Sequence, residues 1–217
     1  MNTIGVREVF VTFWHIKSYA QLKKCSYDVL HDRKYLCQGL LVDWDLFANS
    51  VGKRGKLMKI CLYNSILGEY TLAQSEKGLC GIWLQGQKHE FGAWNNEPKI
   101  LEDTPLFKRV KQWLDAYFDG QNREIDFPLD LKGTPFQIQV WSILLAIPYG
   151  ETITYKVIAK RISPTMSCQA VGQAVGHNPI SIVVPCHRVI ATSGQLTGYA
   201  GGIEVKKWLL KHEGVLK

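Results

Sequence analysis

The chain has 217 residues, of which 46% are hydrophobic, and this is enough to bury one large core or two small ones. No run of about 18 apolar residues occurs, so the sequence predicts no transmembrane helix. The first residues also lack the charged-then-apolar layout of a signal peptide. We therefore expect a soluble protein without membrane contacts, cytoplasmic or, in a eukaryotic host, nuclear.

Charge is unevenly distributed around a formal net charge of +7. Residues 1–59 carry ten Lys and Arg against five Asp and Glu, a net +5, whereas residues 60–128 carry seven against ten, a net −3. Residues 129–217 return to +5, with nine against four. This last part suits a surface that meets phosphates, although ordinary solvated lysines explain the excess about as well.

The cysteines are scattered and form no Cys-x-x-Cys pair: they are Cys25, Cys37, Cys61, Cys80, Cys168 and Cys186. A secreted disulfide scaffold would be shorter and richer in cysteine, so reduced thiols are expected. A zinc site combining Cys25, His31 and Cys37 is a weak alternative, because its ligands lack paired spacing. No metal and no cofactor are predicted.

Residues 1–56 form an N-terminal extension that is aromatic, contains cysteine and shows only weak periodicity. It ends in the basic stretch Lys53-Arg54-Gly55-Lys56. Three interpretations stay open for it: an added subdomain, a segment that binds a partner, or a poorly ordered extension.

Residues 57–128 are expected to form a small α/β domain. Apolar runs separated by turns predict three short strands, over residues 58–63, 70–74 and 79–84. A helix is predicted over 104–118, because Thr104 suits an N-cap and Pro105 suits the first helical position. Strands followed by a helix indicate a small α/β domain that ends near Phe127-Pro128.

Residues 129–217 are expected to form a second, mostly helical domain. An apolar helix over 136–147 is predicted to stop before Pro148. Two short helices follow, over 155–162 and 167–176, and their tight connection indicates a helix-turn-helix. Small residues in the second helix let its backbone approach a ligand closely, although tight packing against a neighbouring helix explains them nearly as well.

The run Ile180-Ser181-Ile182-Val183-Val184 predicts a buried strand that stops just before Cys186 and His187. A thiol is a poor nucleophile until it ionises, and a neighbouring imidazole commonly promotes ionisation near neutral pH. An inert buried cysteine is the alternative interpretation. A glycine-rich loop over 198–202 and a final helix over 204–212 complete the chain.

Three separated motifs agree in order and spacing: Pro185-Cys186-His187-Arg188, Gly198-Tyr199-Ala200-Gly201-Gly202 and Trp208-Leu209-Leu210-Lys211-His212-Glu213. Together they resemble the O6-alkylguanine-DNA alkyltransferase family, over residues 57–217 and most specifically 133–213. The resemblance implies an α/β N-terminal domain with a ribonuclease-H-like sheet, then a mostly α-helical C-terminal domain with a helix-turn-helix. It also implies DNA repair, in which the protein transfers an alkyl group, such as methyl, from O6 of guanine to its own cysteine once.

The resemblance assigns the chemistry to four residues. Cys186 is the nucleophile, and His187 accepts the thiol proton through a water. Glu213 holds the imidazole and favours its charged form. Tyr155 helps to rotate the target nucleotide and donates a proton or hydrogen bond to the guanine ring, because a guanine anion is a poor leaving group. Without the family, Tyr155 and Glu213 would be ordinary helix residues.

The resemblance also implies how the substrate is held. Asn178 is a hinge that links the second helix of the helix-turn-helix to the cysteine segment through hydrogen bonds to backbone groups. The backbone of the loop Tyr199-Ala200-Gly201 reads the edge of the flipped guanine, together with the carbonyls of Val189 and Cys186. These residues would form the walls of the base pocket.

The implied partner is double-stranded DNA containing O6-alkylguanine, bound by a monomer. Because O6 lies inside the duplex stack, the nucleotide has to be flipped out of it. The family lays its second helix in the minor groove, where small side chains fit. The predicted DNA contacts are Lys156, Gln169, Ala170, Gly172 and Arg188, with Lys160 and Arg161 as further phosphate contacts.

Gln169 departs from the family pattern, which has an arginine that replaces the flipped base in the stack. Glutamine is shorter, is neutral and cannot stack as a guanidinium plane does, but it can hydrogen-bond the orphaned cytosine. Two other functions stay open: an alkyltransferase-like sensor that binds alkylguanine without transfer, and a Cys-His hydrolase. The sensors lack the cysteine that this chain keeps as Cys186, and the basic surface disfavours the hydrolase.

Overall fold

The computed structural model describes residues 29–30, 34–37, 40–43 and 57–217. The chain divides into two compact units, Met1–Gly55 and Lys56–Lys217. The described part of the first unit is an antiparallel sheet of order β1-β2-β3, formed by Val29–Leu30, Lys34–Cys37 and Leu40–Asp43. Cys25 and His31, two ligands of the zinc alternative, lie outside the described residues.

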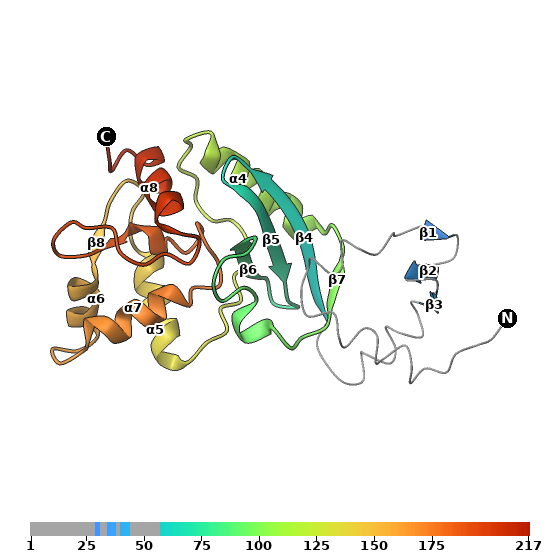
Figure 1. The fold of residues 1–217 in the computed structure, drawn as a ribbon, viewed down its shortest axis with the longest axis horizontal. Helices are drawn as coiled ribbons and strands as arrows, with labels where there is room; N and C mark the ends of the chain where they lie inside the picture. The colour runs from blue at the N-terminus through green and yellow to red at the C-terminus, as the bar shows by residue number, and fades with distance from the viewer. Residues whose placement is uncertain (1–28, 31–33, 38–39, 44–56) are drawn as a thin grey trace. The chain divides into compact units, whose positions relative to one another are not determined.

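The second unit begins with a four-stranded sheet of order β6-β5-β4-β7 (Figure 1). Its strands are β4 (Met58–Ser65), β5 (Gly68–Gln74), β6 (Leu79–Leu84) and β7 (Lys99–Leu101). The first three are antiparallel neighbours and confirm the three predicted strands. The sequence did not predict β7, which pairs in parallel with β4, because three residues are too few to show a period.

Helix α4 (Pro105–Phe118) packs against β4 and β5 and confirms the predicted helix. The Thr104 side chain accepts a hydrogen bond from the Phe107 N–H at 3.2 Å, and this caps the first turn. The buried side chains Phe107, Val110, Leu114 and Tyr117 recur every three or four residues, so they face the sheet together.

Helices α5 (Pro135–Leu145), α6 (Tyr155–Ile162), α7 (Cys168–Gly176) and α8 (Ile203–His212) gather beyond β6, at the opposite edge of the sheet from β7 (Figure 1). The predicted helices are therefore confirmed, with shifts of one or two residues at some ends. α6 and α7 pack against each other as the predicted helix-turn-helix. A short parallel pair, β8 (Ile153–Thr154) and β9 (Val189–Ile190), was not predicted.

The segment before Cys186 is not the buried strand that the sequence predicted. Ile180 makes one isolated parallel bridge to Ile82 of β6, and the chain then turns. Ile182 has φ +71°, a left-handed conformation that costs a β-branched residue roughly 1–3 kcal/mol. A short 3₁₀ helix, η2 (Cys186–Arg188), follows. The β-branched side chains here report burial rather than strand structure.

One apolar core runs from the sheet into the helices of the second unit. Leu72 and Ile82 of the sheet share it with Trp141 of α5 and with Val184, beside the reactive segment. The sheet followed by helices is the predicted α/β-then-helical order. In the part of the chain that the structure describes, no helix has the length and apolar character needed to cross a bilayer.

Candidate active site

Asn178 holds Cys186 in place from the end of α7. Its Nδ2 donates to the Val184 carbonyl at 2.7 Å and to the Cys186 Sγ at 3.1 Å, while its Oδ1 accepts from the Ile180 N–H at 3.1 Å. The amide thus supplies hydrogen bonds that a neighbouring strand would otherwise provide. Asn178 is 4% exposed, so these bonds are made out of water and hold the turn firmly.

The Cys186 thiol is 5% exposed. Burial raises its pKa, against the lowering effects of the Asn178 hydrogen bond and the Lys206 charge. The raised pKa favours the protonated thiol at rest. A thiolate has to form by proton transfer during the reaction.

His187 directly follows Cys186 in the chain and is fully buried. Its Nε2 is 2.7 Å from Glu213 Oε1. Burial lowers the pKa of His187, opposed by the Glu213 hydrogen bond and reinforced by Arg188 and Lys206, so the resting imidazole is neutral. A carboxylate only accepts hydrogen bonds, which places the proton on Nε2 and leaves Nδ1 as an acceptor.

Glu213 is the centre of a buried polar cluster at the end of α8. Besides His187, its carboxylate accepts hydrogen bonds from Tyr117 Oη at 2.7 Å and from Arg188 Nε and Nη2 at 2.8 and 3.0 Å. Burial alone would raise the pKa of Glu213, but the His187 and Arg188 hydrogen bonds outweigh it and lower the pKa to about 2. The carboxylate stays ionised at any physiological pH.

Arg188 does not occupy the DNA surface where the sequence placed it. It is 8% exposed, and its guanidinium bonds Glu213 bidentately and the Ile147 carbonyl through Nη1 at 2.6 Å. A guanidinium held in this way balances the buried carboxylate. The predicted DNA contact from Arg188 is therefore corrected: the residue supports Glu213.

Lys206 of α8 was missed by the sequence analysis. Its Nζ is buried and donates to the carbonyls of Val189 at 2.6 Å and Thr197 at 2.9 Å. Burial lowers the pKa of Lys206 to about 8, although Cys186 opposes this. The ammonium ties the start of the glycine-rich loop to β9. It also engages the Val189 carbonyl that was predicted to read guanine, so that carbonyl has one lone pair left.

A small pocket opens beside the thiol. It is lined by Val175, Gly176, Asn178, Ser181, Cys186, Gly198, Tyr199 and Ala200. The predicted Tyr199 and Ala200 therefore meet Cys186 at one site, whereas Gly201 and Val189 are not among the lining residues. The loop is held from two sides, because the Ala200 carbonyl also accepts the Lys88 N–H at 3.3 Å.

Tyr155 is the first residue of α6 and points toward the same loop. Its Oη donates to the Thr197 carbonyl at 3.1 Å. Burial raises the pKa of Tyr155, so the phenol keeps its proton and can donate it. A Cβ at Gly172 would lie 3.8 Å from the Tyr155 ring, so α7 passes close to α6 at this small residue.

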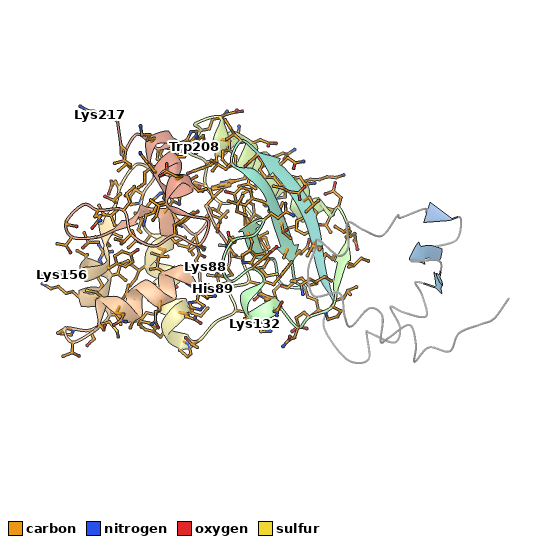
Figure 2. The ribbon with its side chains drawn as sticks, in the orientation of Figure 1. Lys88, His89, Lys132, Lys156, Trp208 and Lys217 are labelled. Atoms are coloured by element: carbon orange, nitrogen blue, oxygen red, sulfur yellow. The ribbon has the colours of Figure 1, made fainter. Side chains whose placement is uncertain are left out.

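The remaining predicted DNA contacts lie on α6 and α7. Lys156, Lys160 and Arg161 of α6 are exposed, and Figure 2 shows Lys156 projecting away from the sheet. Gln169 of α7 is exposed, whereas Ala170 and Gly172 are half-buried. The small residues therefore let α7 pack closely against α6 while part of their surface stays exposed.

Two histidines meet near the pocket. His89 lies in the segment after β6, and His177 directly follows α7. Their rings stack with centroids 4.0 Å apart. Figure 2 labels His89 next to Lys88. Burial and the neighbouring His177 lower the pKa of His89. The described residues contain no group of three or more His, Cys, Asp or Glu able to hold a metal ion.

Two domain families match the chain. One is described as 6-O-methylguanine DNA methyltransferase, ribonuclease-like domain, and matches residues 58–131. The other is described as 6-O-methylguanine DNA methyltransferase, DNA binding domain, and matches residues 135–215. The first covers the sheet and α4, and the second covers the helix-turn-helix, Cys186 and Glu213.

Several named proteins are similar to this chain. A methylated-DNA–protein-cysteine methyltransferase of Methanosarcina acetivorans is 42% identical over 160 residues, which are 72% of this chain and 99% of that protein. A protein of the same name from Mycobacterium bovis is 46% identical over 150 residues, 69% of this chain and 88% of that protein.

The fold is also similar to solved structures. A Mycobacterium tuberculosis OGT, solved in complex with DNA, aligns with a TM-score of 0.64 and 43% identity, covering 71% of this chain and 92% of that one. The M. tuberculosis O6-methylguanine methyltransferase aligns with a TM-score of 0.63 and 44% identity, over 72% and 92%. These matches confirm the resemblance seen in the sequence. The chain belongs to the methylated-DNA–protein-cysteine methyltransferase family, the O6-alkylguanine-DNA alkyltransferases.

Proposed function

We propose that this protein repairs double-stranded DNA by transferring an alkyl group from O6 of guanine to Cys186 Sγ, once per molecule. Family membership supports the reaction class, and one observation carries the assignment of the nucleophile. Cys186 faces the pocket, bonded to Asn178 and next to a histidine whose far nitrogen is held by an ionised carboxylate. Such an arrangement can take a proton from a thiol at the moment of attack.

In the proposed reaction the S–C bond forms as the bond between the alkyl carbon and O6 breaks. The thiol proton passes through a water to Nδ1 of His187, and Glu213 stabilises the imidazolium. The departing guanine takes up a hydrogen bond or proton from the Tyr155 phenol, which would first leave the Thr197 carbonyl. The product is a thioether, which ordinary redox chemistry and hydrolysis do not reverse, so each molecule acts once.

The proposed DNA surface is the helix-turn-helix of α6 and α7. The exposed Lys156, Lys160 and Arg161 would contact phosphates without reading sequence, as a search for damage requires. α7 would enter the minor groove with Gln169 at its leading turn, and the target nucleotide would flip into the pocket. We further propose that the protein acts as a monomer, in the cytoplasm or, in a eukaryote, the nucleus.

Intact-protein mass after incubation with DNA containing O6-methylguanine tests this proposal. One methyl group per molecule is expected, with no further gain at longer times. Cys186→Ala should gain nothing while still binding DNA. Cys168→Ala, which removes an exposed cysteine at the start of α7, is the matched control and should react fully. Alkyl uptake by Cys186→Ala would assign the chemistry to another residue, and DNA binding without uptake by the unaltered protein would indicate a sensor.

A further inference from the structure

Tyr70 of β5 carries a buried hydroxyl that the reaction described above does not use. The residue is 1% exposed, and its Oη has no hydrogen-bond partner among the residues that the structure describes. Buried hydroxyls in folded proteins nearly always bond to a protein group or an ordered water. The Tyr70 hydroxyl therefore calls for a partner that is not a described side chain or backbone group.

Tyr70 lies on the side of the sheet that faces the active site. It pairs with Tyr63 of β4 and with Leu84 of β6, and it shares one apolar core with Cys186. A Cβ at Gly201 would lie 3.4 Å from the Leu84 side chain, so this end of β6 touches the pocket loop. The bridge from Ile82 to Ile180 joins the same strand to the cysteine segment. The phenol is thus buried in the core that the sheet shares with the active site.

The electrostatics agree with this placement. Burial raises the pKa of Tyr70 well above its usual value, and the charge that Cys186 carries when it ionises raises it further. Tyr70 in turn contributes to the raised pKa of Tyr199, which lines the pocket. The phenol therefore stays protonated throughout the working pH range, as a hydrogen-bond donor within electrostatic reach of the sulfur.

A second unpartnered polar atom lies on the residue that follows Cys186. Nδ1 of His187 is buried and, within the described part of the chain, also has no hydrogen-bond partner. It is an acceptor, because Nε2 carries the proton that bonds Glu213. The donor belongs to a residue of the core that contains Cys186, and the acceptor belongs to the residue that follows Cys186. A buried donor and a buried acceptor without protein partners match the two sides of a bound water.

We propose that Tyr70 is a positioning residue for the thiol proton, acting through a water that it shares with His187 Nδ1 and Cys186. This rests on the proposed alkyl transfer. The water accepts a hydrogen bond from Tyr70 Oη and takes the Cys186 proton, while it gives its own proton to Nδ1. The products are a thiolate and an imidazolium, and Tyr70 keeps its proton. The four-stranded sheet that contains Tyr70 would thereby contribute directly to the reaction.

The other groups around this relay are left intact by a change at Tyr70. The charge of an ionised Cys186 acts on Tyr155 of α6, Tyr199 of the loop and Lys206 of α8. His187 faces Glu213 and Arg188, and it also feels the charge of Lys206. Because Tyr70→Phe removes one oxygen and none of these groups, a change in the pH profile reports on the phenol itself.

The test compares Tyr70→Phe with Tyr63→Phe, its direct neighbour on β4, whose hydroxyl bonds Asp115 at 2.8 Å. Single-turnover transfer from O6-methylguanine DNA is measured from pH 5.5 to 9, together with thermal unfolding. Tyr70→Phe should react about tenfold more slowly at pH 7, equivalent to about 1.4 kcal/mol. The deficit should be smaller at pH 9, where a larger fraction of the thiol ionises without the relay. Its melting temperature should not fall, and Tyr63→Phe should keep the wild-type rate and profile.

A wild-type rate for Tyr70→Phe at every pH would overturn the proposal, above all if the melting temperature rises as an unpartnered hydroxyl is removed. A slower rate with an unchanged pH profile would also overturn it, because a packing defect is the simpler cause. Neither result changes the assignment of Cys186 as the nucleophile. That assignment fails only if Cys186→Ala still gains an alkyl group, so the two proposals fail separately.

Discussion

Tyr117 Oη donates a hydrogen bond to Glu213 Oε1 at 2.7 Å, joining the helix that covers the sheet to the carboxylate beside the reactive histidine. The two residues are 96 positions apart in the chain. Tyr117 is 2% exposed and Glu213 is 5% exposed, so the bond lies out of water. The helix that covers the sheet thus supplies one of the hydrogen-bond donors to the Glu213 carboxylate.

Tyr117→Phe should destabilise the protein by about 1.5–3 kcal/mol, because a buried carboxylate loses a donor. Tyr149→Phe is the matched control, since its hydroxyl donates to the neutral His212 carbonyl at 3.3 Å in a less buried place. It should cost about 0.5–1.5 kcal/mol. Urea unfolding of both variants measures the difference, and equal losses would contradict the special role of the carboxylate.

Glu213→Gln should slow alkyl transfer at pH 7 by about a hundredfold, because the imidazolium formed on His187 loses its counter-charge. The deficit should shrink toward pH 9, where a larger fraction of the thiol ionises without the relay, so the profile of the variant moves to higher pH. Glu204→Gln, at the exposed start of α8, is the control and should match the wild type. Single-turnover rates of the variant and the wild type are measured across pH 6–9. Parallel pH profiles of the two proteins would refute the proton relay.

Glu213 also makes stability depend on pH. Its folded-state pKa of about 2 lies below the usual 4.5, so the stability it contributes is present above pH 4.5. That contribution is lost as pH falls from 4.5 through 2. Unfolding free energies of wild type and Glu213→Gln should converge over this window, and a constant gap from pH 7 to pH 2 would contradict the lowered pKa.

Lys206→Met should slow transfer by about tenfold, because the sulfur loses a positive charge that favours its thiolate and the loop loses its tie to β9. Rates from duplex DNA and from free O6-benzylguanine should fall together, since the tie shapes the pocket itself. Lys207→Met, the exposed neighbour, is the control. A loss confined to duplex DNA would assign Lys206 to DNA binding instead.

Gln169→Arg should speed transfer from duplex DNA by up to roughly tenfold, because an arginine fills the vacated stack and adds a charged donor, equivalent to about 1.4 kcal/mol. The side chain is exposed, so the change does not disturb packing. Free O6-benzylguanine needs no flipping and should react at the wild-type rate. If only the free-base rate changes, position 169 acts on the pocket and the placement of α7 in DNA is wrong.

A chain that begins at Lys56 should fold and transfer alkyl groups at the wild-type rate. The compact second unit begins at Lys56, and the family matches begin at residue 58. Circular dichroism and single-turnover kinetics check both points. An insoluble or inactive product would show that residues 1–55 complete the core or the site.

The sequence determined the elements whose signals are local. The Thr-Pro starts of α4 and α5, the spacing of apolar residues in α4 and the paired short helices α6 and α7 are properties of neighbouring residues, so they could be read directly. The Cys186-His187 pair and its spacing to Glu213 identified the family, because a short reactive motif can be recognised from neighbouring residues alone. Residues 180–184, before Cys186, were wrongly predicted to form a strand, since burial and strand structure favour the same β-branched residues.

Only the tertiary structure decided what each polar side chain contacts. Arg188 looked like a DNA contact, but its guanidinium turns inward to Glu213 because a buried carboxylate needs a counter-charge. Tyr117, Lys206 and Tyr70 carried no sequence signal beyond an apolar or charged helix or strand position. Their roles depend on carbonyls, a carboxylate and a thiol that lie far away in the chain. Folding brings these groups together, and burial makes each unpaired one costly.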